Sequence, residues 1–68
     1  MEEIQKEVIK TFGSECIMTG DEIKTTLNDI YQHYNVRFYP EIKALEKFGY
    51  SLDRFLENGK FKYKIVKI

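Results

Sequence analysis

The carboxy-terminal part of the sequence alternates between apolar and charged residues after a two-residue turn signal. Asn-Gly at 58–59 is the dipeptide best suited to a tight hairpin, because both residues tolerate positive φ. Leu52 and Phe55-Leu56 precede the turn. The alternation after it predicts a strand with one packed face and one ladder of ammonium groups, and therefore a closing β-hairpin. Its apolar positions are Phe61, Tyr63 and Ile65, and its charged positions are Lys60, Lys62 and Lys64.

The amino-terminal segment has the spacing of an amphipathic helix. Ile4, Val8 and Phe12 lie four residues apart, which predicts a helix from Glu2 to Phe12 that Gly13 ends. The next five residues, 14–18, contain Cys-Ile-Met and are too short for a helix, so they predict a brief extended strand.

A second helix is predicted from Gly20 to Tyr34. Thr19 and Glu22 have the spacing of a capping box, in which each side chain satisfies a backbone donor at a helix start. Asn35 can adopt the left-handed conformation that ends a helix. The apolar positions with helical spacing are Ile23, Leu27, Ile30, Tyr31 and Tyr34.

A short third helix is predicted from Pro40 to Phe48. Proline suits the first position of a helix, where its fixed φ and missing donor are harmless, and Gly49 ends the segment. Ile42, Leu45 and Phe48 would be buried. The short connection from the second helix predicts a compact helix-turn-helix corner.

These elements predict a single α+β domain over residues 1–68, in the order helix, strand, helix, helix, strand, strand of a winged helix. A chain of 68 residues cannot enclose a deep cavity between two lobes. The single Cys16 excludes an internal disulfide framework and a Cys-rich zinc site, and we interpret it as a small buried hydrophobe. His33 lacks catalytic partners and fits a structural role at a helix end. We therefore expect no enzymatic activity, metal or cofactor.

The charge is divided between the two halves of a chain whose formal net charge is zero. Residues 1–35 hold three lysines against seven acidic residues, a net charge of −4, and residues 36–68 hold eight basic against four acidic residues, a net charge of +4. Such a chain can present one basic face. No apolar run has the length of a membrane span, and Glu2 and Glu3 stand where a secretory signal would be basic, so we expect a cytoplasmic protein with no membrane partner.

Three stretches resemble one family: 22–31 (EIKTTLNDIY), 45–49 (LEKFG) and 58–65 (NGKFKYKI). They look like the carboxy-terminal winged-helix domain of phage, plasmid and poxvirus-type primase-helicases, with its Leu-x-x-x-Gly ending of the third helix and its Asn-Gly-Lys wing. The resemblance implies a role in replication initiation of a mobile element, as a DNA-binding module or an accessory protein. Glu41 and Glu46 depart from it, since they stand where a phosphate-facing helix would carry neutral or basic residues.

The cations and two tyrosines of the basic half are the candidate site for DNA, single- or double-stranded. Phosphate recognition requires cations on a fixed scaffold. Lys43 and Lys47 lie four apart and would share a face of an α-helix. Tyr39 and Tyr50 flank that helix and could stack on an unpaired base or hydrogen-bond a phosphate. We expect one continuous surface with limited sequence specificity. Its residues are Arg37, Tyr39, Lys43, Lys47, Tyr50, Arg54, Lys60, Lys62 and Lys64.

Other interpretations compete with this one. The lysine ladder also suits an edge strand that resists aggregation, and Lys43 and Lys47 suit a solvated helix face paired with Glu41 or Glu46. Winged helices also mediate dimerisation or dock on a larger replication protein, with the acidic half as the docking side. A phage-encoded inhibitor of a host protein is a third possibility.

Overall fold

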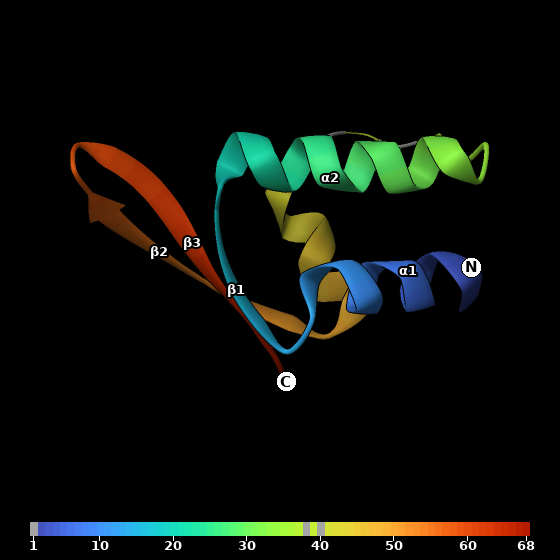
Figure 1. Ribbon diagram of the computed structural model, residues 1–68, viewed down its shortest axis with the longest axis horizontal. Helices are drawn as coiled ribbons and strands as arrows, with labels where there is room; N and C mark the ends of the chain where they lie inside the picture. The colour runs from blue at the N-terminus through green and yellow to red at the C-terminus, as the bar shows by residue number, and fades with distance from the viewer. Residues whose placement is uncertain (1, 38, 40) are drawn as a thin grey trace.

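The described part of the chain forms six elements, which follow one another in the predicted order. The computed structural model describes residues 2–37, 39 and 41–68. In Figure 1, α2 and α1 lie one above the other with η1 between them, and the β2–β3 hairpin projects to one side. The result is a small α+β domain with three helices and one antiparallel sheet. The elements are α1 (Glu2–Phe12), β1 (Glu15–Thr19), α2 (Gly20–His33), η1 (Ile42–Phe48), β2 (Tyr50–Glu57) and β3 (Lys60–Lys67).

The predicted helix boundaries are confirmed where local chemistry defines them. Gly13 follows α1 with φ of 69°. At the start of α2, the Glu22 N–H donates to Thr19 Oγ1 (3.2 Å) and the Thr19 N–H donates to Glu22 Oε1 (3.0 Å), which is the predicted capping box. The helix ends at His33, one residue earlier than predicted, and Asn35 has φ of 56°.

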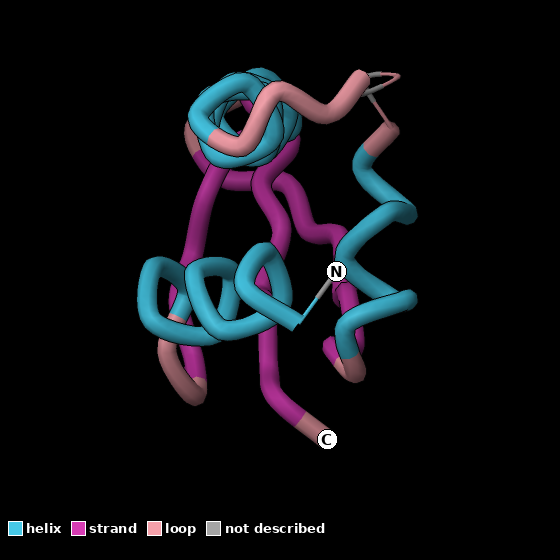
Figure 2. The backbone as a smooth tube through the Cα atoms, turned by 90° about the vertical axis from the view of Figure 1, so that its right-hand side faces the viewer, coloured by secondary structure: helices cyan, strands magenta, loops and turns pink. Residues whose placement is uncertain are grey.

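The sheet has the strand order β1-β3-β2, with both pairs antiparallel. Asn58 and Gly59 have φ of 52° and 76°, as a two-residue hairpin turn requires. The first strand begins and ends one residue later than predicted. In Figure 2, which looks along α2, the strands lie behind α1 and η1.

Alternation assigns each strand residue to one of two sheet faces. Ile65 is buried, and its register partners Cys16 and Leu52 point to the same side, which we call the inner face. Lys64 and its partner Ile17 belong to the opposite, outer face, where Ile17 is exposed. The helices therefore pack on the inner face.

One hydrophobic core joins the three helices to the inner face. It confirms the stripes predicted for the two α-helices and, in the third helix, Leu45 and Phe48, whereas Ile42, which was also predicted to be buried, is only partly buried. Cys16, Met18, Tyr34, Leu52 and Tyr63 are partly buried against it. The buried residues are Ile4, Val8, Phe12, Ile23, Leu27, Ile30, Tyr31, Ala44, Leu45, Phe48, Tyr50 and Ile65.

The third helix differs from its prediction. An α-helix from Pro40 to Phe48 is wrong, because residues 42–48 form a 3₁₀ helix; Pro40 itself lies outside the described residues. Its apolar residues Ile42, Leu45 and Phe48 are spaced by three, which is the period of a 3₁₀ helix, so this geometry places them along one ridge. Within the described residues, no side chain caps the start of η1 at Glu41.

Candidate nucleic-acid interface

The predicted DNA-binding residues do not form one continuous surface. Tyr50 belongs to the core, and the others lie in three places: the outer face of the sheet, a hollow beside the end of α2, and a groove between α2, η1 and the hairpin. The pleat of the hairpin and the 3₁₀ geometry of η1 separate them.

Tyr50 is a structural residue, so its prediction as a base-stacking platform is wrong. Its side chain is 1% exposed, and its ring lies 6.1 Å from that of Phe12. Its hydroxyl donates a hydrogen bond of 2.6 Å to the carbonyl oxygen of Gly13. Burial raises the pKa of this hydroxyl. The hydrogen bond of Tyr50 therefore links the turn between α1 and β1 to the start of β2.

The lysines of the outer face are accompanied by carboxylates. Lys62 Nζ lies 2.9 Å from Glu57 Oε1, and Lys64 Nζ lies 3.8 Å from Glu15 Oε1. The hydrogen bond and the negative charge of Glu57 raise the pKa of Lys62. Asp53 is the register partner of Lys64 on β2. The outer face therefore carries balanced charge, which reduces its attraction for a polyanion.

Lys43 and Lys47 do not share a face. In a 3₁₀ helix each residue turns by about 120°, so side chains four apart point in different directions. Lys43 lines the groove beside the hairpin, whereas Lys47 lines a hollow beside the end of α2. That hollow also contains Arg37 and Tyr39, and the Tyr39 side chain is exposed.

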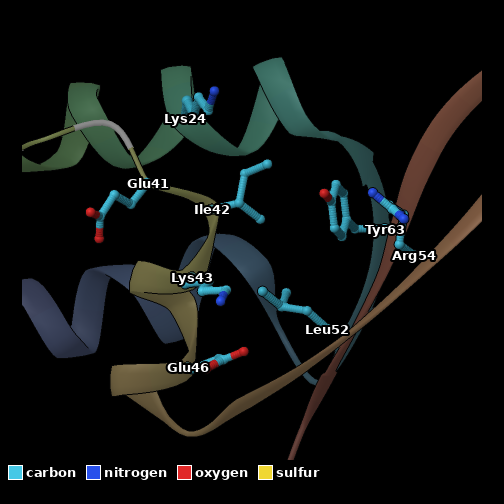
Figure 3. Close-up of a pocket in the computed structure, with 8 residues that line it drawn as sticks. All are labelled: Lys24, Glu41, Ile42, Lys43, Glu46, Leu52, Arg54 and Tyr63. Atoms are coloured by element: carbon cyan, nitrogen blue, oxygen red, sulfur yellow. The ribbon is translucent and has the colours of Figure 1, made fainter.

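A groove of about 560 Å³ opens between α2, the start of η1 and the inner face of the hairpin. The apolar part of its lining consists of Ile42, Leu52 and Tyr63. Figure 3 shows the Ile42 side chain lying between α2 and the two hairpin residues. In the same view the carboxylate of Glu41 points away from Tyr63. The polar residues that line the groove are Lys24, Glu41, Lys43, Glu46 and Arg54.

A second hollow continues the groove toward the hairpin turn. It shares Lys24, Ile42 and Tyr63 with the first, and adds Lys60 and Phe61. Lys60 is the first residue of β3; alternation places it on the outer face with Lys62, and it lines this hollow beside the hairpin turn. We call the two hollows together the hairpin groove. Thr19, Gly20 and Asp21 complete its lining.

Four cations reach the hairpin groove from four different elements: Lys24 from α2, Lys43 from η1, Arg54 from β2 and Lys60 from β3. Within the part of the chain that the structure describes, ion pairs form at Lys62 and Lys64 and at none of these four. Glu41, Glu46 and Asp21 also line the groove, so its formal charge is +1.

Sequence reasoning missed Lys24, Ile42 and Phe61 as residues of this groove. Lys24 lies in the acidic half of the chain, and only the packing of α2 against η1 brings it to the same groove as Lys43. The contact of the two helices is close: a Cβ atom added to Gly20 would lie 2.8 Å from Ile42 Cδ1. Phe61 was expected to be packed, but it is 56% exposed because the hairpin extends past the helices (Figure 1).

Comparisons with known proteins leave the family open: no protein-family model matches the chain, and no significant match was found among curated proteins or solved structures. Among the residues that the structure describes, none of the helices has the length and apolar character needed to cross a membrane. The described residues also contain no cluster of three or more His, Cys, Asp or Glu side chains placed to hold a metal ion.

Proposed function

We propose that the chain is a DNA-binding module of winged-helix type, and that DNA lies along the hairpin groove. The element order and the sheet order β1-β3-β2 support the winged-helix assignment, with β2 and β3 as the wing. Replication initiation of a mobile element is the role that the sequence resemblance suggests for it.

The observation that carries this proposal is the convergence of four cations on one groove. Cations on a rigid scaffold attract phosphates and release their counterions, which supplies much of the affinity of proteins for nucleic acids. Lys24, Lys43, Arg54 and Lys60 stand on four different elements that a common core holds in place. Three acidic residues in the same lining reduce the net charge, so the expected binding is weak and depends strongly on salt.

The test is to remove two positive charges from the groove or from the outer face and to compare the results. Fluorescence anisotropy of labelled DNA over a salt series measures the affinity and its salt dependence. We expect Lys43→Ala with Arg54→Ala to weaken binding and to reduce the slope of log K against log salt by about 1.4–1.8, if each cation meets one phosphate.

The matched control is Lys62→Ala with Lys64→Ala, which removes the same charge from the outer face. These lysines already pair with Glu57 and Glu15, so this variant should keep most of the affinity. An equal loss in both variants would show that net charge matters and the groove does not. No binding of the unmodified protein at low salt would contradict the proposal itself.

A protein-docking role is the second candidate, and the outer face favours it. Ile17 is 57% exposed at the centre of edge strand β1, beside charges that are balanced. Edge strands and exposed apolar side chains serve as contact sites between proteins. Light scattering after size exclusion would test self-association: this role predicts a dimer that Ile17→Lys converts to a monomer.

A further inference from the structure

Two large apolar side chains remain uncovered at the hairpin end of the groove. Leu56 and Phe61 are register partners on the inner face, and they are 61% and 56% exposed. Tyr63 and Ile65, farther along β3 on the same face, are covered by the helices to increasing degrees. The exposed pair therefore arises because the hairpin extends beyond the body of the domain (Figure 1).

An arginine lies over the exposed ring. The guanidinium carbon of Arg54 is 4.8 Å from the centroid of Phe61, which is the geometry of a cation–π contact. Arg54 and Phe61 each line one of the two hollows of the hairpin groove, and Lys60 lines the same hollow as Phe61. A flat apolar surface thus lies beside Arg54 and Lys60, with Asp21 as the acidic residue of the same hollow.

This combination fits an unpaired nucleic-acid base better than a base pair. Proteins that bind single strands combine cations that follow the backbone with aromatic rings on which bases stack. A base inside a duplex has both faces covered by its neighbours, so it cannot offer one to Phe61. An apolar segment of a protein would also cover Leu56 and Phe61, but it would offer no negative charge to the surrounding cations.

We propose that Phe61, together with Arg54, is a stacking platform for an unpaired base, and that the hairpin groove consequently binds single-stranded DNA in preference to duplex DNA. This inference rests on the proposed function, since it names the form of DNA that the same groove takes. It adds a binding residue, Phe61, that charge alone would not indicate.

The test uses Phe61→Leu, which removes the aromatic face and keeps an apolar side chain at an exposed position. The ligands are a thymidine oligonucleotide of about 12 nucleotides and a duplex of the same length, both measured by anisotropy at low salt. We expect the unmodified protein to prefer the single strand, and Phe61→Leu to lower that affinity by about tenfold with little effect on the duplex. Phe61→Tyr should retain the preference.

Ile9→Ala is the control, because Ile9 is an exposed apolar residue of α1 that lines neither hollow of the groove. It should leave both affinities unchanged. A preference of the unmodified protein for duplex would overturn the inference, as would equal effects of Phe61→Leu on both ligands. Unchanged binding by Phe61→Leu would also overturn it and would favour a protein contact for this apolar pair. These three results leave DNA binding by the groove intact, whereas no binding of either ligand refutes both proposals.

Discussion

Replacing Tyr50 by phenylalanine separates the structural role of this residue from a role in DNA binding. The change removes only the hydroxyl that donates 2.6 Å to the Gly13 carbonyl, in a side chain that is 1% exposed. A hydrogen bond of this kind contributes about 0.5–1.5 kcal/mol, and because Gly13 is exposed, water can replace the donor that its carbonyl oxygen loses. We expect the free energy of unfolding to fall by about 0.5–1.5 kcal/mol.

For a domain of this size, each 1 kcal/mol lowers Tm by about 4–8 °C. Circular dichroism during heating and urea unfolding would measure the loss, and anisotropy would show unchanged DNA affinity below the transition. Tyr39→Phe is the matched control. The Tyr39 side chain is 70% exposed, so removal of its hydroxyl group should leave Tm unaltered. A Tyr50→Phe protein as stable as the unmodified one would refute the structural assignment. A Tyr50→Phe protein that lost DNA binding while its Tm stayed unchanged would also refute the structural assignment.

Three further changes test the fold. Leu27→Ala opens a cavity at a fully buried position, so urea unfolding should show a loss of about 2–5 kcal/mol. Gly59→Ala places a side chain at φ of 76° in the hairpin turn, and should lower stability by about 1 kcal/mol in the same assay. The hydrogen bonds with Thr19 lower the pKa of Glu22 from its usual 4.5, so an NMR titration should find its midpoint below that value. Because the folded-state pKa is depressed, the stability from this contact is complete above the unfolded-state pKa and is lost as pH falls through the folded-state pKa. Glu22→Ala should therefore lower Tm more at neutral pH than at a pH well below that midpoint. The same loss of Tm at both pH values would contradict the predicted pH dependence.

Features encoded in short stretches of sequence were predicted correctly. The capping box, the helix ends and the Asn58-Gly59 turn depend on the conformational preferences of a few adjacent residues, so the sequence alone defines them. The third helix was assigned the wrong type, since a spacing of three between Ile42, Leu45 and Phe48 fits one face of an α-helix as well as the ridge of a 3₁₀ helix.

The candidate site was harder to predict because it depends on contacts between distant segments. The alternation in β3 correctly grouped Lys62 with Lys64, but the sequence does not show that Glu15 of β1 lies beside them. The position of Lys24 in the hairpin groove likewise follows from the packing of α2 against η1. Tyr50 was assigned to the surface from its place after η1, although its two-residue spacing from Leu52 is consistent with the inner face of the sheet.

The proposed function places DNA in the hairpin groove and not against the lysines of the outer face. Two isoleucine methyl groups report on these surfaces: Ile42 lines the groove, and Ile17 lies beside Lys64 on the outer face. NMR of isoleucine methyl groups during titration with a short DNA oligonucleotide would compare them directly. Our account predicts that the Ile42 signal shifts with DNA concentration while the Ile17 signal stays in place. A shift of Ile17 with Ile42 unchanged would contradict it.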